Sequence, residues 1–162
     1  MAVPATPGLA DLPPSVRRVA IVSGYFNPLH IGHLDMMEAA RALADGLVVI
    51  VNNDDQQVLK KGKVITSEAD RLRVVEALRI TDAALVAVDT DGSVAASLEV
   101  VHAAYPGVGL TFCNGGDRDP DRDAVPTAEN AVCERLGIEM AWGVGGTTKA
   151  DSSTRINEAL GI

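Results

Sequence analysis

Two kinds of hydrophobic pattern alternate along this chain of 162 residues. Short apolar runs, rich in Val, Ile and Leu, predict buried β-strands at 17–23, 46–52, 82–88, 109–113 and 138–142. Longer segments, with apolar residues three and four positions apart, predict helices at 31–44, 67–79, 93–104 and 127–136, and a last helix that starts near Ser152. The polar stretch 52–66 is predicted to be a loop.

The order of these elements predicts the fold class. Strands and helices that alternate with short connections form a Rossmann-like, doubly wound α/β domain, with a mainly parallel five-stranded sheet flanked by helices. We expect residues 17–162 to form this domain and residues 1–16, rich in Pro and Ala, to be an N-terminal leader. Ligands of such sheets bind beyond the carboxyl ends of the strands.

Composition narrows the classes of function. Apolar residues make up 47% of the chain and aromatic residues 3%, which suits an aliphatic core around a buried parallel sheet. The net charge of −8 argues against a general nucleic-acid binder, although a few cations in one cleft would still bind a nucleotide. Cys113 and Cys133 lack metal-ligand spacing, so we expect buried thiols in a reducing cytoplasm. No apolar run is long enough to span a membrane, and no membrane partner is expected.

Residues that carry chemistry concentrate where the first predicted strand meets the first predicted helix. Residues 24–33 read Gly-Tyr-Phe-Asn-Pro-Leu-His-Ile-Gly-His. This order places His30 and His33 at a helix N-terminus, where backbone N–H groups favour phosphate oxygens. Gly24 and Gly32 let a ligand approach the backbone closely. Both histidines could instead be structural, but two of the chain's three histidines at such a junction favour phosphate chemistry.

Three further polar groups follow predicted strands. Three lysines, Lys60, Lys61 and Lys63, follow the second strand, 114–118 (Asn-Gly-Gly-Asp-Arg) follows the fourth, and 152–155 (Ser-Ser-Thr-Arg) follows the fifth. Taken singly, these groups could be a solvated charge cluster, a turn and a helix N-cap. Because the carboxyl ends of parallel strands meet at one sheet edge, the groups together predict one anion-binding site.

The pattern Gly-x-Phe-(Asn/Asp)-Pro-x-His-x-Gly-His at 24–33 resembles the signature of the cytidylyltransferase-like nucleotidyltransferases. The serines at 152–154 resemble that family's last motif, and 68–71 resembles its Glu-x-x-Arg helix start. The resemblance implies catalytic roles for His30, His33, Lys61 and Lys63, and substrate contacts from Lys60 and Arg71. It implies nucleotide contacts from Gly24, Tyr25, Phe26, Asn27, Gly32, Gly116, Asp117, Arg118, Ser152, Ser153 and Thr154.

The resemblance also implies a reaction. An acceptor oxygen attacks the α-phosphorus of a nucleoside triphosphate, pyrophosphate leaves, and Mg²⁺ arrives with the triphosphate without a metal site of the protein. The nearest likeness is to the cytidylyltransferase domain joined to phosphoenolpyruvate phosphomutase in fosfomycin biosynthesis, so we expect transfer of CMP from CTP to a small phosphonate, 2-hydroxyethylphosphonate.

Similarity to heptose-phosphate enzymes and to glycerol-phosphate cytidylyltransferases keeps other acceptors open. The first alternative is ATP as donor with heptose 1-phosphate as acceptor, and an alternative of another class is a non-catalytic nucleotide sensor. Because relatives are often dimers, a homo-oligomer is an expectation, as is membership of a longer multidomain chain. No nucleic-acid partner is expected.

Overall fold

The structure is a computed structural model, which describes residues 9–115, 128–145 and 152–162. Along the chain the elements are β1 (Arg18–Gly24), α1 (Ile31–Arg41), β2 (Gly46–Val51), α2 (Asp54–Lys61), α3 (Glu68–Glu76), β3 (Ala83–Val86), α4 (Ala95–Ala104), β4 (Gly109–Gly115), α5 (Ala128–Leu136), β5 (Glu139–Val144) and α6 (Ser153–Leu160).

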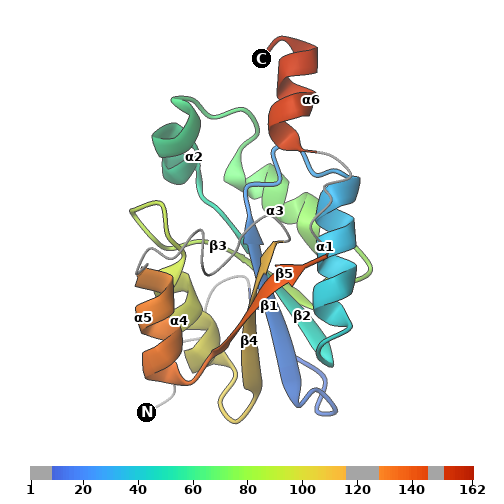
Figure 1. The fold of residues 1–162 in the computed structure, drawn as a ribbon, viewed down its shortest axis with the longest axis vertical. Coiled ribbons are helices and arrows are strands. Elements are labelled where there is room, and N and C mark those ends of the chain that lie inside the picture. Colours follow the sequence, from blue (N-terminus) through green and yellow to red (C-terminus); the bar gives the residue numbers. More distant parts are fainter. Residues whose placement is uncertain (1–8, 116–127, 146–151) are drawn as a thin grey trace.

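The strands form one five-stranded sheet in the order β3-β2-β1-β4-β5, and every neighbouring pair is parallel (Figure 1). β1 lies at its centre between β2 and β4. The Rossmann-like α/β class predicted from the sequence is confirmed. Because all the strands run the same way, the residues that follow β1, β2 and β3 emerge at the same sheet edge.

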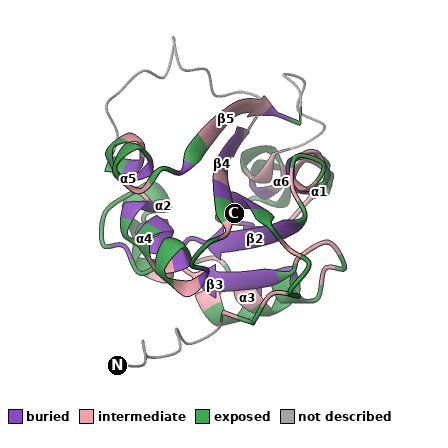
Figure 2. Ribbon diagram, turned by 90° about the horizontal axis from the view of Figure 1, so that it is seen from below, coloured by how far each residue is buried: buried purple, intermediate pink, exposed green. Residues whose placement is uncertain are grey.

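Strands β1 to β4 are largely buried on both faces, as a parallel sheet requires, and the edge strand β5 is mostly half-buried (Figure 2). Successive side chains of β1 show this: Val19 and Ile21 belong to one apolar cluster, and Ala20 and Val22 belong to the other. The first cluster includes residues of α4 and α5, and the second includes residues of α1 and α3. Branched aliphatic side chains dominate both clusters, in agreement with the low aromatic content.

The described part of the predicted leader, 9–16, lies on this core. Leu9, Leu12 and Val16 pack against the cluster under α4 and α5. The Tyr105 hydroxyl, at the end of α4, donates a hydrogen bond of 2.7 Å to the carbonyl oxygen of Ala10. Burial raises the pKa of Tyr105 to about 12, so this hydroxyl keeps its proton at physiological pH.

The prediction that 52–66 is a loop was wrong, because it contains α2. Asn53 caps this helix reciprocally with Gln56: its side chain accepts from the Gln56 N–H, and the Gln56 side chain accepts from the Asn53 N–H. Gly62 ends the helix with a left-handed φ of 77°. The hydrophobic pattern missed α2 because its two fully buried side chains, Gln56 and Gln57, are polar.

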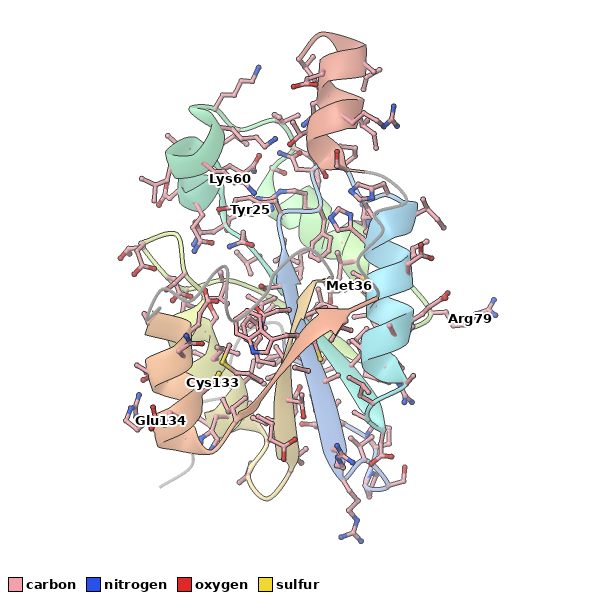
Figure 3. All side chains as sticks on the ribbon, in the orientation of Figure 1. Tyr25, Met36, Lys60, Arg79, Cys133 and Glu134 are labelled. Carbon is pink, nitrogen blue, oxygen red and sulfur yellow. The ribbon has the colours of Figure 1, made fainter. Side chains whose placement is uncertain are left out.

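Other predicted boundaries differ by a few residues. α1 ends at Arg41 and α3 at Glu76, each about one turn earlier than predicted. Arg79, predicted on the apolar face of the second helix, lies beyond α3 and points away from the body of the protein (Figure 3). Ser67 caps α3 as predicted, since its hydroxyl accepts from the Asp70 N–H. Within the described residues, no helix combines the length and the apolar character needed to cross a membrane.

Both cysteines are buried, Cys113 in β4 and Cys133 in α5. Burial raises the pKa of each thiol to about 11, and the Glu129 carboxylate adds to the shift at Cys133. The prediction of small buried thiols is confirmed.

These thiols should therefore react slowly while the protein is folded. At pH 8 the raised pKa leaves about one thiol in a thousand as thiolate, whereas about one in four is a thiolate in the unfolded chain. We expect reaction with Ellman's reagent to be at least about 100-fold slower in the native protein than in guanidinium chloride. Equal rates in the two states would contradict the burial of both residues.

Candidate active site

The site is built on the segment between β1 and α1, here called the histidine loop (24–33). His30 is the N-cap of α1, with extended backbone, and its Nδ1 accepts a 3.1 Å hydrogen bond from the Gly32 N–H. His33 Nδ1 accepts a 3.2 Å bond from the His30 N–H, which completes a reciprocal capping box. The two rings stack with centroids 3.8 Å apart.

This capping fixes the chemistry of both imidazoles. An Nδ1 that accepts a hydrogen bond carries no proton, so the ring proton of each histidine is on Nε2. Each side chain therefore has an N–H donor on the nitrogen away from its own backbone contact. Two stacked N–H donors at the positive end of α1 suit the binding of anionic oxygen.

Phe26 holds the histidine loop in its bend. Its backbone is left-handed, with φ at 51°, an unusual conformation for a bulky residue. Its buried ring meets the His33 ring edge-on, with centroids 4.9 Å apart. The same ring lies over Gly24, where a Cβ would come within 2.9 Å of its Cζ. Gly24 is needed because the ring occupies the space of a side chain.

The last helix joins this site from the far end of the chain. Ser152 caps α6, accepting from the Arg155 N–H at 3.1 Å. Ser153 Oγ donates a 2.9 Å bond to the Pro28 carbonyl, and buried Asn157 Nδ2 donates a 3.0 Å bond to the Asn27 carbonyl. These bonds bring the N-terminus of α6 to the histidine loop, in agreement with the prediction that the serine and histidine motifs share one site (Figure 1).

The lysines approach from the other side, on and after α2. Lys60 Nζ lies 4.5 Å from the centroid of the Tyr25 ring, a cation–π contact (Figure 3). Lys61 ends α2, and Lys63 follows the Gly62 cap and is exposed. Burial raises the pKa of Tyr25, and the Arg71 charge opposes that shift, so the ring under Lys60 stays neutral.

A pocket of about 480 Å³ opens beside Lys60 and Tyr25. Its floor comes from the carboxyl ends of β1 and β2, and its far wall comes from Val94 at the start of α4 and Glu129 of α5. Glu129 is held there by a 3.1 Å hydrogen bond from the Val94 N–H. The pocket thus adjoins the histidine loop, and its described lining includes the cationic Lys60 and the anionic Glu129. Its volume is in the range suited to a small molecule.

Several buried polar residues in and just before α2 were not predicted to belong to the site. Gln57 accepts a hydrogen bond from Asn27 Nδ2 and donates to Asp54 Oδ1 at 2.9 Å, which ties α2 to the histidine loop. Gln56 and Asn52 are joined by a bond of 2.9 Å. The sequence signal that could have found this group is Asn53 three residues before Gln56, a capping pattern.

The predicted site residues are only partly brought together. Arg71, predicted to contact substrate, is instead buried and bonded to protein groups. Gly116, Asp117 and Arg118 lie outside the described residues. In the parts of the chain that are described, no group of three or more His, Cys, Asp and Glu side chains is arranged to hold a metal ion.

The chain is similar to known nucleotidyltransferases. It is 33% identical over 102 residues to the bifunctional protein HldE of Koribacter versatilis, which covers 62% of this chain and 19% of that protein. It is 45% identical over 71 residues to the FAD synthase of Methanosarcina barkeri, covering 44% of this chain and 50% of that one. It is 35% identical over 107 residues to the FAD synthase of Pyrococcus abyssi, and this match covers 65% of this chain and 68% of that one.

A solved structure supports the fold. The lipopolysaccharide core biosynthesis protein of Thermoplasma volcanium superposes with a TM-score of 0.56 at 24% identity, over 83% of this chain and 98% of that one. The sequence profile described as cytidylyltransferase-like matches residues 21–159, which include the histidine loop, the lysines and the serines of α6. The chain therefore belongs to the cytidylyltransferase-like family of nucleotidyltransferases.

Proposed function

We propose that this protein transfers AMP from ATP to the phosphate of a small acceptor, with release of pyrophosphate. An oxygen of the acceptor phosphate attacks the α-phosphorus in line, the bond between the α-phosphorus and the bridging oxygen breaks, and that oxygen leaves with pyrophosphate. The observation that carries the proposal is the pair of Nε2–H donors that the reciprocal capping of α1 presents at the histidine loop. No protein nucleophile is needed, because positioning and charge stabilisation suffice for such a transfer.

The relatives favour an adenylyl donor over CTP. FAD consists of AMP joined to a flavin phosphate, so an FAD synthase transfers an adenylyl group. The heptose-phosphate enzymes that the sequence resembles also use ATP as donor. This supports the ATP alternative better than transfer of CMP to 2-hydroxyethylphosphonate. By analogy with HldE, the first acceptor to test is heptose 1-phosphate, and FMN is the second.

Each part of the site takes one part of the reaction. His30 and His33 donate from Nε2 to oxygens of the α-phosphate and the leaving group. Ser152 and the first N–H groups of α6 bind the terminal phosphates. Lys60, in the pocket, binds the acceptor phosphate, and Lys61 and Lys63 add positive charge on the same side. The described residues offer no cage of protein ligands for Mg²⁺, so we assign that ion to the oxygens of the triphosphate and derive no step through it.

Pyrophosphate release tests the proposal, with ATP and CTP each crossed against heptose 1-phosphate, FMN and 2-hydroxyethylphosphonate in the presence of Mg²⁺. We expect release with ATP and one phosphate acceptor, and at least about tenfold less with CTP. Release only with CTP and the phosphonate would overturn the adenylyl assignment. Nucleotide binding without release for any pair would identify a non-catalytic nucleotide-binding protein.

His33→Asn tests the role given to the imidazole Nε2. The amide oxygen of Asn can replace Nδ1 and still accept from the His30 N–H, but it supplies no donor where Nε2 was. We expect kcat to fall by about 10²–10³-fold, the usual loss for one transition-state donor, with thermal stability nearly unchanged.

The matched control is His102→Asn, on the exposed surface of α4 and outside the site. This variant should retain the wild-type kcat. A His33→Asn variant as active as the His102→Asn control would contradict the catalytic role of His33.

A further inference from the structure

We propose that Arg71 is a positioning residue that holds α2 in register with the histidine loop and so places Lys60 for the acceptor phosphate. The inference rests on the proposed function for what Lys60 binds, but the placement of Lys60 can be measured without catalysis. Arg71 lies on α3 and its side chain is 1% exposed.

Arg71 joins three segments that are separate in sequence. Its Nη1 donates to the Tyr25 carbonyl at 2.8 Å and to the Asn52 carbonyl at 2.6 Å. Its Nη2 pairs with the Asp54 carboxylate at 3.0 Å, and its Nε donates to the Thr66 carbonyl at 2.8 Å. One guanidinium thus contacts the histidine loop, the end of β2 with the start of α2, and the segment after α2.

These contacts determine where Lys60 lies. Tyr25 supplies the ring beneath the Lys60 ammonium, and its carbonyl is the one that Arg71 binds. Asp54 begins α2, six residues before Lys60, and it also accepts from Gln57, which is bonded to Asn27 of the histidine loop. Arg71 and Gln57 therefore hold α2 to the histidine loop by two separate routes, and Asp54 is common to both.

The burial of Arg71 favours positioning over substrate contact. A buried charge is stable only when it is paired and hydrogen-bonded, and here the carboxylate of Asp54 and three carbonyl oxygens do both. The planar fork of Arg suits several acceptors at once, whereas the ammonium of Lys is a single point that cannot reach them all. Arg71→Lys thus keeps the charge and loosens the geometry.

The kinetic test is a double-mutant cycle of Arg71→Lys and Lys60→Ala, measured as kcat/KM for the acceptor. We expect Arg71→Lys to lower kcat/KM for the acceptor by about 30- to 100-fold, because a misplacement of about 1 Å costs roughly this much. The KM for ATP should stay within about twofold of the wild-type value. Because Arg71 acts through Lys60, kcat/KM of the double variant should be no lower than that of the less active single variant. Losses that multiply, or an equal loss of ATP binding, would overturn the proposal.

Val101→Ala separates positioning from mere destabilisation. Val101 is fully buried in α4, in the apolar cluster that includes α4 and α5, so its truncation should lower the melting temperature by several degrees and leave kcat unchanged. If this control loses activity in proportion to its stability, as Arg71→Lys does, Arg71 has only a structural role.

A spectroscopic readout is independent of turnover. Reductive methylation with ¹³C-formaldehyde labels Lys60, and its methyl signals are identified by their absence in Lys60→Arg. The ring current of Tyr25 should displace the chemical shifts of these signals. Arg71→Lys should collapse this displacement, and an unchanged displacement would refute the positioning role. If the displacement collapses but the wild-type protein releases no pyrophosphate, the proposed function fails and the positioning role stands.

Discussion

The reciprocal capping of α1 by its own two histidines is the constraint on which the rest of the site depends. A helix N-terminus leaves backbone N–H groups without partners, and a Ser or Asp usually satisfies them. Here His30 and His33 do so through Nδ1. Because each Nδ1 is committed to the backbone, each ring proton is fixed on Nε2. The side chains that cap the N-terminus of α1 thereby also place two oriented Nε2–H donors at the positive end of the helix dipole.

A second layer, made of buried polar groups, fixes the positions of the two histidine donors and of the α2 lysines relative to one another. Asn27, Gln57, Asp54 and Arg71 form a continuous chain of hydrogen bonds from the histidine loop through α2 to α3. Directional hydrogen bonds among buried polar groups specify one geometry more strictly than apolar packing does. Among the described residues, one atom of this network, Asn27 Oδ1, is buried without a hydrogen-bond partner. α6 adds a polar attachment of its own through Asn157. Apolar side chains on the two faces of the sheet stabilise the scaffold. Polar side chains, by contrast, fix the positions of the site residues relative to one another.

The sequence was sufficient for the scaffold and for the expectation that the histidine and serine motifs lie together, but not for the polar layer behind them. Apolar periodicity identified the strands and most of the helices, because burying one face leaves a repeating pattern. It missed α2, whose buried positions are Gln56 and Gln57 and whose ends are set by Asn53 and Gly62. The family resemblance of 68–71 predicted a substrate contact for Arg71, because a motif does not distinguish a cation in a cleft from one buried among carbonyl oxygens. Whether a charge faces a ligand or the protein depends on contacts distant in sequence.

A long-range ¹H–¹⁵N spectrum of the histidine side chains, recorded with and without α,β-methylene-ATP, shows which ring nitrogen carries each proton and whether it responds to a nucleotide. His102 serves as the internal reference, because it is exposed on α4 and far along the chain from the histidine loop. We expect His30 and His33 to carry their protons on Nε2 in the free protein, and saturation with the analogue to shift both Nε2 signals and leave His102 unchanged. Protons on Nδ1, or a saturated protein in which neither Nε2 signal moves, would refute the role of the two histidines as Nε2–H donors.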